Sequence, residues 1–169
     1  DAVAEWDALC AHGAAARLAR CDAAEAIDVR GLVARSPSLE GVWHAAGVLA
    51  DGLLVRQNAR ALRVVYAPKA HGAGLLHAAL GATALRSCAL FSSVAALLGG
   101  AGQANYAAAN ACLDALAARW RTHGRAATSV QWAGWAEVGM ATRGAAGARL
   151  AAIADASGMG FIAPAAGLA

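Results

Sequence analysis

The chain has 169 residues, a formal net charge of +3 and a hydrophobic content of 59%. Because 52 of those residues are alanine, the apolar fraction overstates the material available for a core, and no apolar run approaches the ~20 residues that a membrane span needs. The 14 basic and 11 acidic residues are too balanced and too dispersed to predict nucleic-acid binding. The length fits one domain or part of one. The composition predicts no membrane partner, and the acidic N-terminus does not look like a secretory or transit peptide.

In chain order, hydrophobic periodicity and breaker residues predict a helix over 1–12, a strand over 14–22, a helix over 23–33, a buried strand over 39–47, a long helix over 53–80 with an irregularity near Pro68, a second buried strand over 85–91, the clearest helix over 103–123, a strand over 127–132 and an alanine-rich helix over 144–156. Strands that alternate with helices, each pair taking roughly 30 residues, indicate right-handed βαβ units and a parallel sheet. The predicted class is α/β. Such sheets bind ligands outside the carboxyl ends of their strands, which directs attention to 44–47, 92–93 and 132–135.

Rare residue types mark positions of interest. Thirteen of the 14 basic residues are arginine and the only lysine is Lys69, while asparagine occurs at 58, 105 and 110 alone. A coding bias against A/T-rich codons would deplete these residue types. Under that hypothesis, the positions that retain them are candidates for a chemical role. The cysteines at 10, 21, 88 and 112 lack C-x-x-C spacing. We interpret them as buried thiols in a reducing, cytoplasmic compartment, and expect neither disulfides nor a metal site.

Four polar residues form a candidate catalytic set. Tyr106 and Asn110 lie four apart on the predicted helix 103–123, so both project from one face beside a glycine-rich loop. Ser93 ends the preceding strand, and Lys69 lies on the helix before it. An ammonium within about 4 to 6 Å would lower the ordinary phenol pKa of ~10. Taken singly, Ser93 could be a helix cap, Tyr106 a packing residue and Lys69 a solvated side chain. Taken together with Asn110, they suit protonation of a carbonyl oxygen as hydride reaches its carbon.

Four segments resemble one family: GVWHAAGVL at 41–49, FSSVA at 91–95, GQANYAAAN at 102–110 and VQWAGWAEVGM at 130–140. They are similar to the ketoreductase domain of polyketide synthases and animal-type fatty acid synthases, within the short-chain dehydrogenase/reductase superfamily. The resemblance implies a Rossmann-like parallel sheet with helices on both faces. It also implies that 1–169 is a partial ketoreductase domain, running from the third strand onward, lacking the first βαβ phosphate-binding segment and truncated at its C-terminal end.

The resemblance implies a role for each member of the set. Tyr106 would donate the proton, Ser93 would hold the substrate carbonyl, Lys69 would contact the nicotinamide ribose and tune Tyr106, and Asn110 would complete the relay. Most members of the superfamily have lysine where this chain has Asn110, and the exchange with Lys69 is typical of ketoreductase domains. Ser92 is the weaker serine candidate, because neighbouring residues of a strand face opposite ways.

Further positions are carried over from the same family. His44, Ala45, Ala46 and Gly47 would line the NADPH cleft together with Lys69 and Tyr106, and Asp22 would lie beside the adenine. Leu49-Ala50-Asp51 resembles the motif of the subtype that makes D-configured hydroxyl products, and Leu98 stands where the opposite subtype has tryptophan. An ordinary role for Asp51 is a turn residue in Asp-Gly.

The implied reaction is NADPH-dependent reduction of a β-ketoacyl thioester to a β-hydroxyacyl thioester, in polyketide or fatty acid biosynthesis. The expected partners are an acyl carrier protein with a phosphopantetheine arm and other synthase domains in the same polypeptide. The chain holds no G-x-G-x-x-G turn to bind a pyrophosphate, so residues 1–169 alone are expected to bind NADPH poorly and to reduce little. A non-catalytic reductase-like subdomain and a stand-alone short-chain dehydrogenase are the alternatives.

Overall fold

The computed structural model describes residues 2–11, 13, 15–81, 83–136, 158 and 160–167. Within this part of the chain a parallel sheet has the strand order β1-β2-β3, with β1 at Gly41–His44, β2 at Ser87–Ser93 and β3 at Thr128–Trp132. The register pairs His44 with Leu90 and Ser93 with Trp132. The predicted α/β class with a parallel sheet is therefore confirmed.

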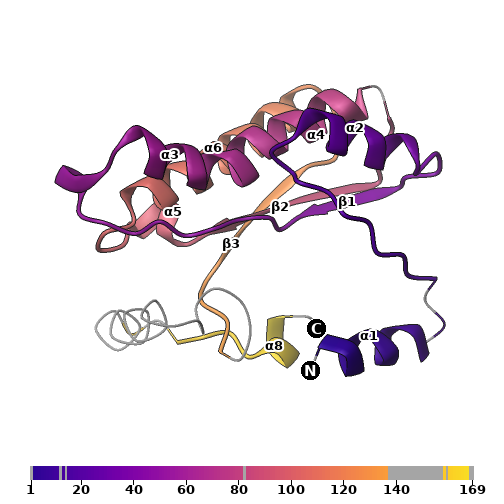
Figure 1. Ribbon diagram of the computed structural model, residues 1–169, viewed down its shortest axis with the longest axis horizontal. Coiled ribbons are helices and arrows are strands. Elements are labelled where there is room, and N and C mark those ends of the chain that lie inside the picture. Colours follow the sequence, from indigo (N-terminus) through magenta and orange to yellow (C-terminus); the bar gives the residue numbers. More distant parts are fainter. Residues whose placement is uncertain are drawn as a thin grey trace.

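The helices follow the predicted order closely. They are α1 (Ala2–Ala11), α2 (Ala26–Ala34), the 3-10 turn η1 (Leu54–Arg56), α3 (Ala59–Tyr66), the π-helical turn η2 (Ala67–His71), α4 (Gly72–Leu80), α5 (Ala95–Leu98), α6 (Ala104–Thr122) and α8 (Pro164–Gly167). Figure 1 shows α2, α3, α4 and α6 on one side of the sheet, with α1 and α8 on the other. No helix among the described residues is both long and apolar enough to span a membrane.

The larger core lies between the sheet and the helices α4 and α6. Leu90 of β2, Leu113 and Ala117 of α6, and Ala73 of α4 are completely buried there. Alanine at the helix positions allows α6 to lie close to the strands. A smaller core forms around Val65, Tyr106 and Ala109, and it joins α3 to the beginning of α6.

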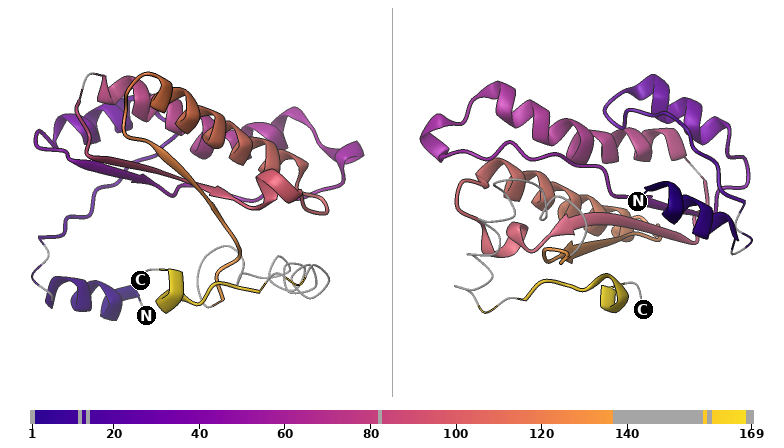
Figure 2. Two further views of the ribbon diagram at one scale, coloured as in Figure 1. Left: turned by 180° about the vertical axis from the view of Figure 1, so that it is seen from behind. Right: turned by 60° about the horizontal axis from the view of Figure 1, so that its bottom comes forward.

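Two predicted strand features are wrong. Residues 15–22 form no strand: among the described residues they have no neighbouring strand to supply backbone hydrogen bonds. The strands over 39–47 and 85–91 are predicted to be buried, yet Trp43 is 64% exposed and β2 alternates buried with half-buried residues. The physical reason is that the main helix layer covers one face (Figure 2). β1 is an edge strand of the described sheet.

The other deviations are smaller. Cys10 and Cys112 are exposed and Cys21 is half-buried, so only Cys88 is a buried thiol as expected. The reason is position: Cys112 lies on the outer face of α6, away from Leu113, which faces the sheet. The irregularity predicted near Pro68 is confirmed as the π-helical turn η2. The alanine-rich helix predicted over 144–156 lies outside the described residues.

Candidate active site

Ser92 and Ser93, the last two residues of β2, have side chains that face different partners. Ser92 is buried against α6, and its Oγ donates a hydrogen bond to the backbone oxygen of Asn110 at 3.2 Å. Ser93 points the other way, accepts a hydrogen bond from the amide of Ala95 at 3.2 Å and is close enough to Tyr106 that its hydroxyl lowers the pKa of the phenol. Alternation along the strand thus leaves Ser93 beside the phenol.

The first turns of α6 carry Tyr106 and Asn110, both buried. One helical turn separates them, and the Asn110 amide donates to the backbone oxygen of Tyr106 at 2.8 Å. The Asn110 side chain also lowers the pKa of Tyr106 through a hydrogen bond. Its Oδ1 is buried and has no partner among the described residues. An unpaired acceptor at that depth is costly unless a water or ligand satisfies it.

Lys69 reaches the same place from the π-helical turn. Wider turns of this kind are rare and occur often at functional sites, and this one contains Pro68, which lacks the amide hydrogen of a regular helix. Lys69 is 2% exposed, and its Nζ donates to the backbone oxygen of Phe91 at 2.9 Å. The same Nζ lies 5.4 Å from the centroid of the Tyr106 ring, within the reach of a cation–π interaction.

Burial moves the two titratable groups in opposite directions. It lowers the pKa of Lys69 to about 8, because removal from water disfavours the charged ammonium. It raises the pKa of Tyr106, and the hydrogen bonds from Asn110 and Ser93 only partly oppose this. The expectation of a lowered pKa for Tyr106 is therefore wrong for the chain by itself, since desolvation outweighs the effects of Asn110 and Ser93 and the Asp51 carboxylate adds to the rise. Tyr106 is a fully protonated phenol at neutral pH and suited to donate.

A loop over 50–52 is fixed to the beginning of α6. The amide of Gly52 donates to the oxygen of Gly102 at 2.8 Å, and the side chain of Asn105 donates to the oxygen of Ala50, also at 2.8 Å. Asp51, on this loop, accepts a hydrogen bond from Gln103 at 3.3 Å. Its other carboxylate oxygen is buried without a partner among the described residues.

Gln103 and Asn105 were not singled out by the reasoning from the sequence, although both are buried. The retention of Asn105 in a chain with asparagine at three positions was the available signal. Leu98, placed by the sequence near the substrate, lies on α5 and is 67% exposed.

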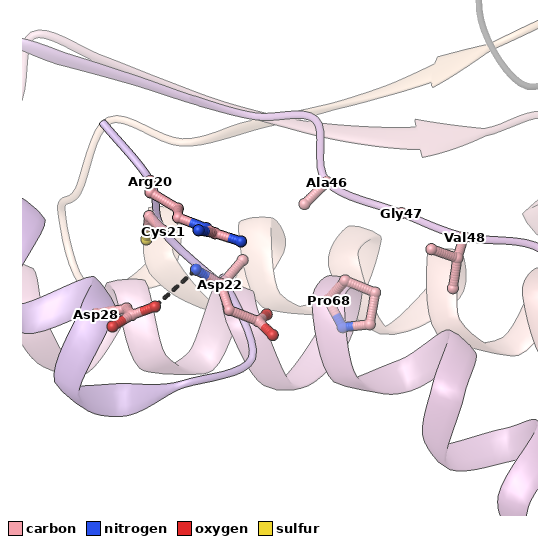
Figure 3. A pocket seen from close by; sticks show the side chains of 9 residues that line it. Arg20, Cys21, Asp22, Asp28, Ala46, Gly47, Val48 and Pro68 are labelled. Atoms are coloured by element: carbon pink, nitrogen blue, oxygen red, sulfur yellow. Dashed lines mark hydrogen bonds between the residues drawn. The ribbon is translucent and has the colours of Figure 1, made fainter. Parts of the chain in front are cut away.

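A cavity of about 620 Å³ lies beside the π-helical turn η2, which contributes Pro68 to its lining (Figure 3). It is lined by Arg20, Cys21, Asp22, Ala23, Asp28, Ala46, Gly47, Val48 and Pro68. Asp22, Ala46 and Gly47 therefore share one cavity, and their contact with the cofactor stays a prediction. His44 and Ala45 do not line it: His44 is buried beneath η2, where its Nε2 lies 3.2 Å from the backbone oxygen of Lys69.

Gly47 joins this cavity to the catalytic group. A Cβ at position 47 would lie 2.8 Å from Cε of Lys69, so the Lys69 side chain packs against the Gly47 backbone in space that any larger residue would fill. The Asp22 carboxylate accepts from the amide of Ala24 at 2.9 Å, and the Asp22 amide donates to Asp28 at 2.9 Å. This arrangement fixes an acidic residue at one end of the cavity.

The chemistry of these groups fits a nicotinamide dinucleotide. The Lys69 ammonium donates one hydrogen to the backbone oxygen of Phe91, so its other two N–H donors can bind hydroxyl groups of a ligand. The cavity adds the Asp22 carboxylate and the backbone of Ala46 and Gly47. Asp22, Ala46, Gly47 and Lys69 are the residues that would hold the group. No cluster of three or more acidic, histidine or cysteine side chains that could bind a metal occurs among the described residues.

Comparison with known proteins identifies the family. The model of the KR domain matches residues 1–137, and the chain therefore belongs to the KR domains, the ketoreductase domains of polyketide synthases, which share the fold of the short-chain dehydrogenases/reductases. Members of this family are nicotinamide-dependent oxidoreductases.

Individual relatives agree. The spectinabilin polyketide synthase system protein NorB of Streptomyces orinoci is 49% identical over 126 residues, which are 73% of this chain and 6% of that protein. The first ketoreductase of the tylosin PKS superposes with a TM-score of 0.84 at 39% identity, covering 96% of this chain and 35% of that one. A ketoreductase domain from the bacillaene assembly line has a TM-score of 0.86 at 29% identity, covering 97% and 41%. The chain thus spans only a small part of each relative.

Proposed function

We propose that this chain carries the catalytic groups of an NADPH-dependent ketoreductase that converts a carrier-bound β-ketoacyl thioester into the β-hydroxyacyl thioester. The observation that supports it best is the convergence of Lys69, Ser93, Tyr106 and Asn110, from three separate elements, around one buried phenol. A scaffold has no use for that set jointly, since burying a lysine and an unpaired amide oxygen costs stability.

Each residue has a task in this reaction. When bound, NADPH supplies the hydride that reduces the ketone carbon. The Ser93 hydroxyl donates a hydrogen bond to the ketone oxygen and fixes its position, and the Tyr106 hydroxyl gives its proton to that oxygen as negative charge develops. The ammonium of Lys69, 5.4 Å from the Tyr106 ring centroid, stabilises the phenolate that remains. The unpaired Oδ1 of Asn110 accepts a hydrogen from a water that returns the proton.

The product is proposed to have the D-configured hydroxyl group. This rests on Asp51, which follows Leu49 and Ala50, and on Leu98 at the position where the other subtype has tryptophan. Asp51 is held by Gln103 on the loop beside α6, so its carboxylate has a defined place near the phenol. Chiral chromatography of the reduced thioester tests this part separately from the reaction itself.

The experiment for the reaction uses the complete synthase module that contains this chain. NADPH oxidation is followed with a β-ketoacyl thioester for the wild type and for Tyr106→Phe. We expect the variant to lose turnover by about 100-fold or more and to keep its affinity for NADPH. Equal rates for the two proteins would refute the assignment. Isothermal titration of residues 1–169 alone with NADPH is expected to show weak binding, and micromolar affinity would contradict this.

A further inference from the structure

The charge along the chain is strongly uneven in one region. Residues 52–113 contain no aspartate or glutamate and five basic residues. Lys69 is buried in the active site, and Arg86 lies 3.5 Å from Glu40. The other three, Arg56, Arg60 and Arg63, are all exposed. Their side chains make no ion pair or hydrogen bond with any residue that the structure describes.

Apolar side chains lie next to these arginines. Leu53, Leu54 and Val55 are 62%, 73% and 89% exposed, in and around η1. We call these six residues, Leu53 to Arg56 with Arg60 and Arg63, the η1–α3 surface. Consecutive apolar residues exposed to this degree, bordered by charge, are typical of an interaction site.

The η1–α3 surface lies beside the candidate active site. Gln57, which directly follows η1, donates to the oxygen of Gly52 at 3.1 Å, and Gly52 is hydrogen-bonded to Gly102 before α6. Asp51 directly precedes Gly52, through which the η1–α3 surface is hydrogen-bonded to the residues before α6. In Figures 1 and 2, the segment from η1 into α3 projects at the same end of the sheet as α5, where β2 ends with the catalytic serine.

We propose that the η1–α3 surface docks an acidic face of the carrier domain that delivers the thioester. The proposal rests on the proposed function, because a tethered substrate must be brought to the edge of the site by its carrier. The charge supports this occupant: three arginines without internal partners attract carboxylates, and Leu53, Leu54 and Val55 would be buried beneath them. Electrostatic complementarity of this kind speeds encounter and sets orientation more than it adds affinity.

A second copy of this chain fits the surface poorly. In a twofold contact the same patch meets itself, so Arg56, Arg60 and Arg63 would face their own counterparts with no carboxylate nearby in the chain segment 52–113. Like charges held together across an interface are unfavourable. An anionic membrane surface is the other possible occupant, and it is distinguished by experiment.

The test uses the complete module with its carrier domain supplied as a separate protein loaded with a β-ketoacyl group. The same acyl group on a short, carrier-free thioester is the second substrate. Reversing the charge in Arg56→Glu/Arg60→Glu/Arg63→Glu should raise KM for the loaded carrier by about tenfold or more and leave reduction of the short thioester unchanged. A matched control, Arg17→Glu/Arg30→Glu/Arg119→Glu, changes the net charge equally at exposed arginines elsewhere and should leave both substrates unaffected.

Salt gives an independent readout. KM of the wild type for the loaded carrier should rise with NaCl concentration, whereas that of the η1–α3 triple variant should change less. The docking proposal is overturned if the triple variant and its control give the same KM for the carrier. It is also overturned if the triple substitution only abolishes sedimentation with vesicles of anionic phospholipid. Wild type that reduces neither substrate contradicts the proposed function itself.

Discussion

Asn105 holds two backbone groups that have no other hydrogen-bond partner among the residues that the structure describes, and its truncation should be costly. Its amide donates to the oxygen of Ala50 at 2.8 Å, and its Oδ1 accepts from the amide of Tyr106 at 2.8 Å. In Asn105→Ala both groups lose a partner in a residue that is 2% exposed. Each unsatisfied buried group costs about 1–3 kcal/mol, so the loss of both partners should lower the free energy of unfolding by about 2–6 kcal/mol. Activity should fall too, because the loop that carries Asp51 loses one of the hydrogen bonds that connect it to the start of α6.

Asn58 provides the matched control. Its side chain accepts from the amide of Ala61 at 3.0 Å and begins α3 at an exposed position, where replacement of a capping asparagine by alanine costs about 1 kcal/mol. Urea unfolding of the complete reductase domain measures Asn58→Ala and Asn105→Ala side by side. If Asn105→Ala is no more destabilising than Asn58→Ala, the reasoning from buried hydrogen bonds is refuted.

Three further predictions concern the groups around Lys69 and the serines. Gly47→Ala places a Cβ 2.8 Å from Lys69 Cε and should lower kcat/KM by about tenfold. The control Gly74→Ala adds a Cβ on α4 that meets nothing within 4 Å, so it should keep activity and raise the free energy of unfolding by about 0.5–1 kcal/mol. Unchanged kinetics for Gly47→Ala would show that Lys69 needs no fixed position. Ser93→Ala should lower kcat by about 100-fold. Ser92→Ala should lower mainly the free energy of unfolding, since its hydroxyl donates to the backbone oxygen of Asn110, its one hydrogen-bond partner among the described residues. The reverse order of effects would exchange the roles of the two serines. The buried Lys69, whose pKa is about 8, loses its proton in the folded chain while the unfolded chain keeps it up to about pH 10.4. The unfolded state therefore binds more protons in this window, and the free energy of unfolding relative to Lys69→Met should rise by up to about 1.4 kcal/mol per pH unit between pH 8 and 10; a flat difference in urea titrations would contradict the burial of Lys69.

Local pattern was sufficient for most of the fold. The helix over 103–123 and the break at Pro68 depend on apolar spacing and on one missing amide hydrogen, both of which are visible in the chain. Residues 15–22 were predicted as a strand and are not one. A strand needs a neighbour along its edge, and neighbours are a property of the assembled sheet rather than of the segment.

The catalytic set was predicted from the joint spacing of its members in a chain with one lysine, Lys69, and from the resemblance of the surrounding segments to ketoreductase domains. The direction of the Tyr106 pKa could not be predicted the same way. It depends on how completely the phenol is withdrawn from water, and burial is decided by Val65 and Ala95 packing around it. The anchoring role of Asn105 also required the structure, because its partner Ala50 lies 55 residues away in the chain.

The central claim is that Ser93 and Tyr106 act as one unit on the substrate oxygen, and a double-mutant cycle tests it most directly. The quantity to measure is kcat/KM of the complete module for wild type, Ser93→Ala, Tyr106→Phe and the double variant, with the short β-ketoacyl thioester as substrate. Residues that work as a unit give strongly non-additive losses, so the double variant should be about as impaired as Tyr106→Phe alone. Losses that simply add in free energy would mean that the two hydroxyl groups act independently, and the active site described above would be wrong.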